Sequence, residues 1–346
     1  MSEEFPPREE YEVVVIGGGP GGMSAALYTT RLGHATALVS GGGGRAPMMA
    51  EVHNLIGVPE GVSGKEFVQT GREQLESYGC DLYRDRIVAA KRNQDGRFRL
   101  ESDDRAYVAD CVVLATGFTD VRPDPPLPRP GRGLHYCLHC DAHLFVDEPV
   151  YVMGHGESAA KVSAIMLNFT DEVDLLTRGA EPEWSEETAR MLANHPIDVI
   201  EADVIGVRNG EDGWLEALEF DDGSVRAYRG GFAMYGAEYN NELARELGCE
   251  INDDGSVAVD EHGRTNVDGV YAVGDLTAGH NQVPVALGEG AKAGISIHWR
   301  LREFPRDLEE LDEGGPVRSE EVPGIPDELL ERAAEAHTYE TGSERD

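Results

Sequence analysis

The sequence predicts an α/β fold that contains two nucleotide-binding domains. Two segments predict it, from Tyr11 to Val39 and from Pro149 to Leu176, because each contains an apolar strand, a glycine-rich loop, a helix and a second strand. Strands of a parallel sheet are buried on both faces and appear as continuous apolar runs. Two such units predict two Rossmann-like domains of three layers each, and 346 residues are enough for both.

The first unit begins with a predicted strand over Tyr11–Ile16, then a helix over Met23–Leu32 and a strand over Ala35–Val39. The loop between the first strand and the helix matches G-x-G-x-x-G, and its candidate binding residues are Gly17, Gly19, Pro20 and Gly22. Such a loop lets the backbone approach a pyrophosphate at the helix N-terminus. Glycines that serve only a turn are the alternative interpretation. Ser40 stands where an acidic residue usually binds the ribose, and it would bind more weakly.

The second unit follows a buried strand predicted over Asp110–Ala115 and a proline-rich connector at 123–130. A strand over Pro149–Met153 leads into a loop of the form G-x-G-x-x-A and a helix that reaches Asn168. A second nucleotide site is therefore expected, with candidate residues Gly154, Gly156, Ser158 and Ala159. Glu172–Leu176 and, near the end of the chain, Gly269–Val273 are further predicted strands.

Charge limits the classes of partner. The chain has 65 acidic and 30 basic residues, a net charge of −35, and only four of the basic residues are lysines. The acids are dispersed, which favours adaptation to a salty cytoplasm over an acidic tail that binds a basic partner. Nucleic-acid binding is disfavoured because phosphate contacts need a basic face. The N-terminus lacks a signal-peptide pattern and no apolar run could span a bilayer, so we expect a cytoplasmic protein without a membrane segment.

Five cysteines occur, and two of them form the motif Cys137-Leu138-His139-Cys140. A C-x-x-C pair can open and close a disulfide. With His135, His139 and His143 nearby, zinc binding is a rival interpretation, and a pair of plain buried cysteines is another. A zinc ribbon has no evident role between two nucleotide-binding units, so no metal site is expected. The single cysteines Cys80, Cys111 and Cys249 are expected to be buried.

The order of these motifs resembles the low-molecular-weight thioredoxin reductase family, a class II group of FAD-dependent pyridine nucleotide-disulfide oxidoreductases. The resemblance covers about Tyr11 to about Leu301. The matching segments are Val15–Pro20, Glu51–Asn54, Ala115–Gly117, Gly131–Gly133, Cys137–Asp141, Gly269–Asp275 and Asn281–Gln282.

This resemblance implies a homodimer in which the second domain is inserted into the first. The expected limits are 1–119 and 243–305 for the FAD domain, 120–242 for the NAD(P)-like domain with the C-x-x-C, and 306–346 for an acidic extension. The residues implied to line the FAD site are Asn54, Thr116, Gly117, Gly274, Asp275 at the ribityl chain, Asn281, and Gln282 at the isoalloxazine ring.

The resemblance also implies roles at the cysteine pair. Cys140 would face the flavin, Cys137 would attack the substrate disulfide, and Asp141 would shuttle protons. A turn residue or helix cap is the alternative interpretation of Asp141 and Asp275. Related dithiol oxidases usually have histidine at the position of Asp141, so we favour reduction of a disulfide.

Two features depart from the family pattern. Of the basic cluster that grips the 2′-phosphate of NADPH, only Arg178 remains, and no acid replaces it in Leu175–Gly179. NADPH, NADH or ferredoxin therefore stay open as the electron donor. The acidic tail after Arg306, with a helix-like stretch over Asp327–Ala336, is expected to be solvated, although His337 and Tyr339 could cover a flavin.

We therefore expect an enzyme that passes electrons from NADPH or NADH through FAD and the Cys137–Cys140 pair to thioredoxin or a similar small redox protein. One alternative keeps this chemistry with ferredoxin as donor or a low-molecular-weight disulfide as acceptor. Another is a flavin redox sensor without turnover, or a metal-binding interaction protein.

Overall fold

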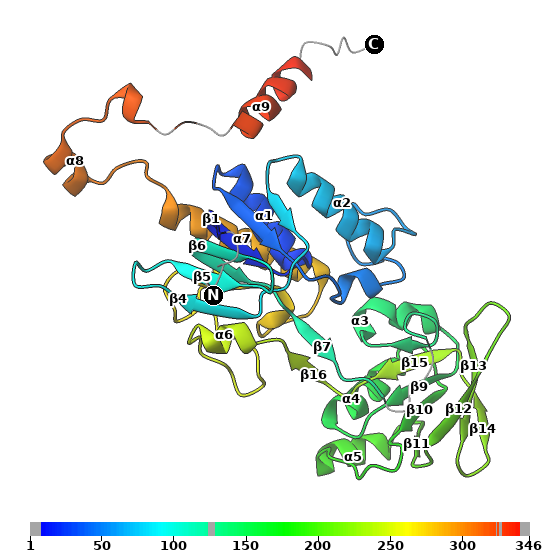
Figure 1. Cartoon of the computed structure of the whole chain (residues 1–346). Helices are drawn as coiled ribbons and strands as arrows, with labels where there is room; N and C mark the ends of the chain where they lie inside the picture. Colours follow the sequence, from blue (N-terminus) through cyan, green and yellow to red (C-terminus); the bar gives the residue numbers. More distant parts are fainter. Residues whose placement is uncertain (1–7, 124–128, 323, 325–326, 340–346) are drawn as a thin grey trace, which may run out of the picture. The chain divides into compact units, whose positions relative to one another are not determined.

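The computed structural model describes residues 8–123, 129–322, 324 and 327–339. The chain divides into two compact units (Figure 1): unit 1 runs to Phe118 and resumes at Tyr239, and unit 2 is Thr119–Glu238. The two connections between them, β7 (Phe118–Asp120) and β16 (Ala237–Tyr239), pair as a two-stranded sheet. The predicted fold class, α/β with a second Rossmann-like domain inserted into the first, is confirmed. The domain limits listed above stay predictions.

Unit 1 is built on a sheet in the order β3-β2-β1-β6-β5-β4. Its strands are β1 (Arg8–Ile16), β2 (Thr36–Val39), β3 (Asp81–Tyr83), β4 (Ala89–Arg92), β5 (Phe98–Glu101), β6 (Ala106–Leu114) and β17 (Val270–Ala272). One edge of β6 pairs with β5 along its first half and, in parallel, with β17 along its second half. This pairing brings the segment after β17 beside the end of β6.

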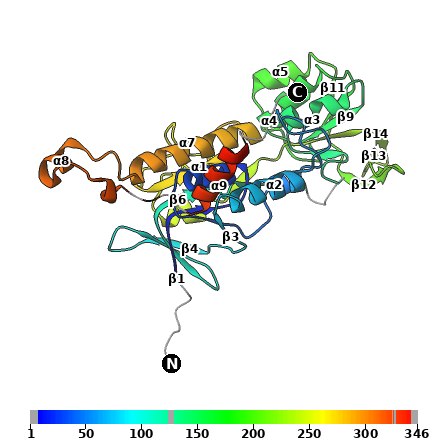
Figure 2. The same ribbon diagram turned by 90° about the horizontal axis from the view of Figure 1, so that it is seen from above.

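Helices cover both faces of this sheet. Accordingly, β1 carries apolar side chains on both of its sides, and these side chains pack in two separate cores. Val13 and Val15 pack with one set of helices, whereas Val14 and Ile16 belong to the opposite core. Figures 1 and 2 show α1, α2 and α7 gathered over the first face. The helices of unit 1 before the tail are α1 (Pro20–Arg31), η1 (Ala46–Met48), α2 (Gly64–Glu76), α6 (Glu242–Glu246) on the second face, η3 (Gly274–Leu276) and α7 (Val283–Leu301).

Unit 2 has a parallel sheet in the order β11-β10-β9-β15-β8 and an antiparallel sheet β12-β13-β14. The parallel strands are β8 (Leu134–His135), β9 (Val150–Met153), β10 (Val173–Leu176), β11 (Ile197–Ile200) and β15 (Gly230–Ala233). The antiparallel strands are β12 (Val204–Asn209), β13 (Leu215–Phe220) and β14 (Val225–Ala227). The helices are α3 (Leu138–Asp141), η2 (Ala142–Phe145), α4 (Glu157–Met166) and α5 (Glu186–Leu192).

Unit 2 has three layers, and the side chains of its central strand β9 contact both outer layers. Val150 and Val152 pack against α4 and α5, and Tyr151 and Met153 pack against the antiparallel sheet. All four side chains are fully buried. The parallel sheet therefore lies between helices and a second sheet.

The predicted strands and helices occur, with ends shifted by one to four residues. The largest shift is at β6, which begins at Ala106 rather than Asp110, and β1 and α1 each begin three residues before the predicted start. Pro125, Pro126 and Pro128 of the predicted connector lie outside the described residues.

The expectation of a single helical stretch in the tail was wrong. Besides α9 (Asp327–Tyr339), the tail contains α8 (Leu308–Gly314) and η4 (Ser319–Glu321). Asp307 caps α8 with its carboxylate and Glu310 bonds back to the backbone of Asp307, a capping box that apolar periodicity does not reveal. The side chains of His337 and Tyr339 lie outside the described part of the structure.

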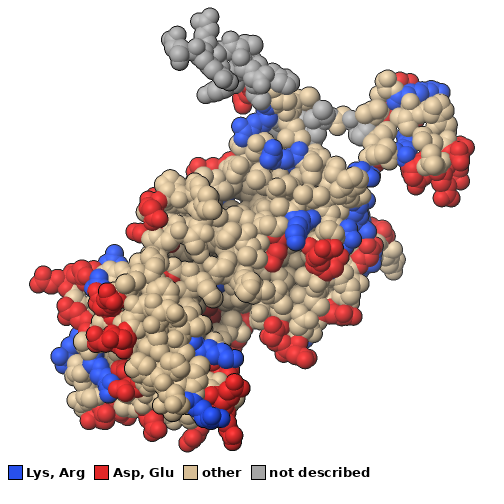
Figure 3. Space-filling model, turned by 180° about the vertical axis from the view of Figure 1, so that it is seen from behind, with Lys and Arg blue, Asp and Glu red and all other residues tan. Residues whose placement is uncertain are grey.

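Acidic side chains are scattered over the faces of the molecule seen in Figure 3 rather than gathered in one block. Among the described residues, no helix combines the length and apolarity that crossing a membrane requires.

Candidate functional site

The first glycine loop joins β1 to α1 and is packed tightly at both ends. Gly17 has a φ of +115°, and a Cβ there would overlap the carbonyl oxygen of Ala115. A Cβ on Gly22 would overlap the carbonyl oxygen of Gly17. A Cβ on Gly19, by contrast, would meet no described atom within 4 Å. The loop is therefore tightly packed at Gly17 and Gly22 and open at Gly19.

Helix α1 begins at Pro20 directly after this opening, with Gly19 as its N-cap. No described side chain caps the helix and no acid lies in its first turn. The backbone N–H groups and the positive end of the helix dipole at this opening suit a phosphate group. Ser40, which follows β2, lies beside the loop, since a Cβ on Gly18 would be 3.0 Å from its Oγ.

Thr116 and Gly117, at the end of β6, are held by Asn240. The Thr116 hydroxyl donates to the Asn240 carbonyl oxygen (2.7 Å), and the Asn240 side chain donates to the Thr116 carbonyl oxygen (2.9 Å). The N–H of Asn240 donates to the Gly117 carbonyl oxygen. Asn240 lies 124 positions further along the chain than Thr116, and the sequence analysis missed it.

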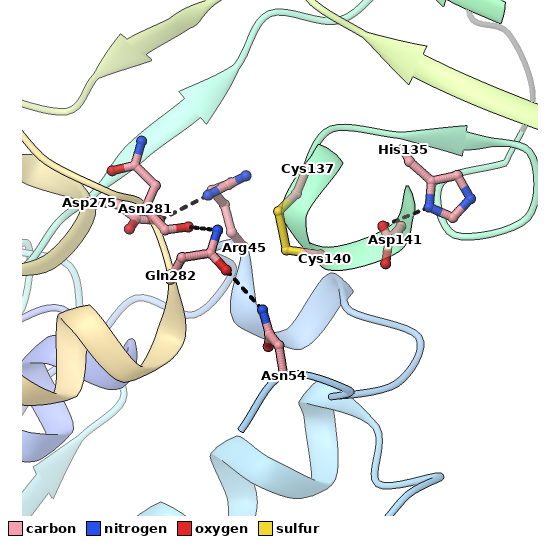
Figure 4. Close-up of a disulfide and its surroundings, with 9 residues drawn as sticks. All are labelled: Arg45, Asn54, His135, Cys137, Cys140, Asp141, Asp275, Asn281 and Gln282. Carbon is pink, nitrogen blue, oxygen red and sulfur yellow. Dashed lines mark hydrogen bonds and ion pairs between the residues drawn. A yellow bond between two sulfur atoms is a disulfide. The ribbon is translucent and has the colours of Figure 1, made fainter. Parts of the chain in front are cut away.

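Asp275 follows β17, and its carboxylate forms an ion pair with Arg45. Arg45 Nη1 lies 3.0 Å from Asp275 Oδ2 (Figure 4). The Arg45 guanidinium lies 4.4 Å from the centroid of the Phe118 ring. The structure thus adds Arg45 to the candidate site, a residue that was not predicted from the sequence. The only local signal was its place directly after the glycine run 41–44.

Asn54 and Gln282 meet at the start of α7, where Asn54 Nδ2 donates to Gln282 Oε1 over 2.8 Å (Figure 4). Gln282 also donates to the carbonyl oxygen of Asn281. Close by, the N–H of Gly274 donates to Glu289 Oε2 over 2.7 Å. Burial raises the pKa of Glu289 above its usual range. The residues expected at the FAD site thus gather in unit 1, and the open cradle at Gly19 fits a dinucleotide pyrophosphate.

The cysteine pair lies in unit 2, on a single turn of helix. Cys137 is the N-cap of α3, Cys140 lies within the helix, and the two are joined by a disulfide. Leu138, between them, is buried and anchors the turn in the core, whereas both cysteines are half-buried. The expected C-x-x-C geometry is therefore present, with the pair in the oxidised form.

Asp141 follows Cys140 directly and points toward His135 (Figure 4). His135 Nδ1 lies 2.7 Å from Asp141 Oδ2; the imidazole is 2% exposed and the carboxylate-bearing side chain 24%. His139 and His143, by contrast, are exposed. Within the described chain, no three His, Cys, Asp or Glu side chains are grouped so that they could hold a metal ion.

The second glycine loop repeats the pattern of the first. Gly154 has a φ of +144°, and a Cβ there would lie 2.8 Å from the Met234 carbonyl oxygen and 2.9 Å from the Ala159 Cβ. Gly156, like Gly19, would place a Cβ in open space among the described residues. Ser158 is exposed in the first turn of α4. The loop can therefore admit a nucleotide phosphate.

Arg178, at the end of β10, is already engaged by an acid. Its Nε donates to Asp203 Oδ1 over 2.7 Å, and its side chain is only 8% exposed. Asp203 lies between β11 and β12, so its position beside Arg178 depends on the neighbouring strand β11. Asp203 is 25 residues from Arg178 along the chain, so the residues adjacent to Arg178 in the sequence do not reveal this acid.

Together, the fold and the disulfide define a class: a two-unit α/β oxidoreductase whose cysteine pair forms a disulfide. A family model described as pyridine nucleotide-disulphide oxidoreductase matches residues 11–290. The chain belongs to this family, which implies a flavin and a pyridine nucleotide, and the expectation of an enzyme is confirmed.

Individual relatives agree with this assignment. The chain is similar to a thioredoxin reductase from Aquifex aeolicus (strain VF5), with 28% identity over 84% of this chain and 93% of the relative. It is 30% identical to a thioredoxin reductase from Peptoclostridium litorale, over 85% and 98% of the two chains. The crystal structure of thioredoxin reductase from Streptococcus pyogenes MGAS5005 has a TM-score of 0.79 at 26% identity, covering 85% of this chain and 99% of that one.

Proposed function

We propose that this chain is a FAD-dependent disulfide reductase of thioredoxin-reductase type, which passes electrons from a pyridine nucleotide to a small redox protein. The observation that carries the proposal is the Cys137–Cys140 disulfide in a chain that also has a dinucleotide loop in each unit. Its curated relatives named thioredoxin reductase support thioredoxin as the acceptor.

FAD would be held in unit 1. The α1 N-terminus with Gly19 would receive its pyrophosphate, and Ser40, which lies beside this loop, would bind a ribose hydroxyl. The Arg45–Asp275 pair and Gln282 would line the rest of the site. When bound, FAD would take up two electrons from the nucleotide and release them to the disulfide.

The cysteine pair would then reduce the acceptor by thiol–disulfide exchange. The Cys137 thiolate attacks one sulfur of the acceptor disulfide and releases the other as a thiolate, which leaves a mixed disulfide. Cys140 next attacks the Cys137 sulfur, which frees the reduced acceptor and restores the disulfide. We assign Asp141 the transfer of the accompanying proton, because it follows Cys140 directly and is partly exposed.

NADH is the donor that we favour over NADPH. Recognition of the 2′-phosphate needs an available cationic side chain. Arg178 is the only residue left from the expected basic cluster, and its guanidinium is occupied by Asp203. NADH needs no such contact.

An anaerobic titration of the holoenzyme in molar KCl tests the proposal. We expect NADH to bleach the visible flavin band, and thioredoxin in its disulfide form to restore it. The Cys137→Ser variant should keep its flavin and lose disulfide reduction, whereas Cys249→Ser, which changes a buried cysteine outside the pair, should keep both. Equal turnover in Cys137→Ser and the unsubstituted protein would overturn the mechanism.

Three other outcomes identify the alternatives. Bleaching by dithionite but by neither nucleotide would make ferredoxin the leading donor. Turnover with a low-molecular-weight disulfide but not with thioredoxin would change the acceptor. A bound flavin without any turnover would indicate a redox sensor.

We further propose a homodimer adapted to high salt. Exposed apolar side chains on the packed helices α1 and α7 could cover one another in a second copy, namely Tyr28, Leu32, Ile295 and Trp299. The net charge of −35 is screened as the Debye length falls from about 10 Å at 0.1 M salt to about 3 Å at 1 M. Light scattering and activity across this salt range test both points: a monomer, or activity that falls with salt, would contradict them.

A further inference from the structure

We propose that His135 is a positioning residue for the cysteine-pair chemistry: through a hydrogen bond from Nδ1 it orients the Asp141 carboxylate for proton transfer. This inference rests on the proposed disulfide reductase function. It concerns an interaction contained entirely in unit 2.

The hydrogen bond closes the segment that carries the disulfide. His135 is the last residue of β8, and the chain then turns through Cys137 and the short helix α3 to Asp141. The contact between His135 Nδ1 and Asp141 Oδ2, at 2.7 Å, joins the two ends of this segment (Figure 4). The position of the carboxylate beside Cys140 is thus determined by a residue that precedes the pair.

Aromatic side chains hold the imidazole in place. Phe145 meets it edge-on with ring centroids 5.2 Å apart, Trp214 stacks on it at 6.2 Å, and Phe232 lies at 6.0 Å. They come from η2, the residue before β13, and β15, so the ring is enclosed by three separate segments. Rotation of the ring would have to displace buried side chains.

The protonation of the ring follows from its two nitrogens. Nδ1 faces a carboxylate oxygen, whereas Nε2 is buried and has no hydrogen-bond partner among the described residues. A proton on Nε2 would be a buried donor without an acceptor, which costs about 1–3 kcal/mol, whereas an unshared electron pair there needs no donor. The proton therefore resides on Nδ1, which donates to the carboxylate of Asp141.

Other ionisable side chains lie on the elements around the imidazole. They are His139 on α3, His143 in η2, and the Arg229–Asp212 pair, whose guanidinium lies 4.6 Å from the centroid of the Trp214 ring. The remaining carboxylate oxygen, on a side chain that is 24% exposed, can exchange a proton with solvent.

This arrangement gives His135 a definite role in the proton balance. When the reduced pair attacks a disulfide, an S–S bond forms, another breaks, and one thiol must lose its proton as it becomes the attacking thiolate. The ionised Asp141 accepts this proton and passes it to solvent or to the departing thiolate. The Nδ1–H donor fixes the carboxylate in the position from which it accepts this proton.

The test uses the holoenzyme reduced with dithionite and the small disulfide 5,5′-dithiobis(2-nitrobenzoate), with the exchange rate followed against pH. His135→Phe keeps the aromatic packing and removes the donor. The acid limb of its pH–rate profile should therefore move to higher pH, and the exchange rate on that limb should be about 10-fold lower. His135→Asn places an amide N–H near the position of Nδ1 and should restore the original profile. A purely structural role would leave the shape of the profile unchanged in both variants.

A double-mutant cycle with Asp141→Asn makes the test specific. If His135 acts through Asp141, His135→Phe should have no further effect on the profile in the Asp141→Asn background. Additive effects, or an unshifted His135→Phe profile, would overturn the inference. Should His135→Phe not fold, His135→Gln also lacks a donor at the Nδ1 position and should show the same shift.

The two proposals fail in different ways. If the unsubstituted reduced protein does not exchange with the probe, the proposed function fails. If it exchanges and the His135→Phe profile matches it, the proposed function stands and the role of His135 is refuted.

Discussion

Arg178 and Asp203 form an ion pair at the carboxyl end of the parallel sheet of unit 2, with Nε 2.7 Å from Oδ1. Asp203 is itself fixed, since its Oδ1 also accepts the N–H of Val204. The cation that would bind a 2′-phosphate is therefore already neutralised by a nearby carboxylate. In the proposed reductase, we expect the choice of nucleotide to depend on that pairing and not on Arg178 alone.

Removal of the Asp203 charge should shift the nucleotide preference toward NADPH. In Asp203→Asn the guanidinium can turn to a phosphate, and we expect the ratio of kcat/KM for NADPH over NADH to rise about five- to tenfold. Anaerobic flavin reduction with each nucleotide measures it. Glu211→Gln, which removes one exposed acid elsewhere in unit 2, is the control for net charge. An equal change in both variants would show that Arg178 is not near the phosphate.

The thiols outside the pair should be unreactive. Burial raises the pKa of Cys80 to about 12 and that of Cys111 to about 11, and it also raises the pKa of Cys249. At about pH 8 a thiol of pKa 11 is only about one part in a thousand thiolate. After mild reduction, iodoacetamide followed by mass spectrometry should find Cys137 and Cys140 modified and the other three modified only upon unfolding. Alkylation of Cys111 as fast as Cys137 would contradict this.

Two glycines of the first loop should fail in different ways when changed to alanine. A Cβ on Gly22 overlaps the carbonyl oxygen of Gly17, so Gly22→Ala should destabilise the protein by at least about 1–3 kcal/mol. Gly19→Ala meets only open space among the described residues, so its native circular dichroism should persist while its flavin content falls. Flavin absorbance per protein and thermal unfolding measure both effects. Full flavin content in Gly19→Ala would mean that the cofactor does not approach this residue.

Local patterns predicted the parts of the structure that depend on neighbours in the chain. The strand–loop–helix segments that begin at β1 and at β9 could be predicted from the sequence. The periodicity of apolar residues, tight turns and helix starts each depend on a few adjacent residues. The Cys137–Cys140 spacing likewise places two sulfurs on one helical turn. The capping box that starts α8 is also local, but it leaves no signal in the apolar periodicity.

Contacts between distant residues could not be predicted in this way. Arg45 and Asp275 are 230 positions apart and meet because β17 lies next to β6 in the sheet of unit 1. Asp203 reaches Arg178 because β11 is the neighbour of β10. Strand order decides both pairs, and spacing along the chain does not encode strand order.

By itself, the sequence determined the class of fold, the two glycine-rich loops and the cysteine pair, since each rests on local chemistry and spacing. Only the tertiary structure decided which side chains those motifs work with. It showed that Arg178 is paired, and that His135, one of three nearby histidines, is the one bonded to Asp141. The physical reason is that hydrogen bonds act over about 3 Å, and only the packed sheets bring these groups within that distance.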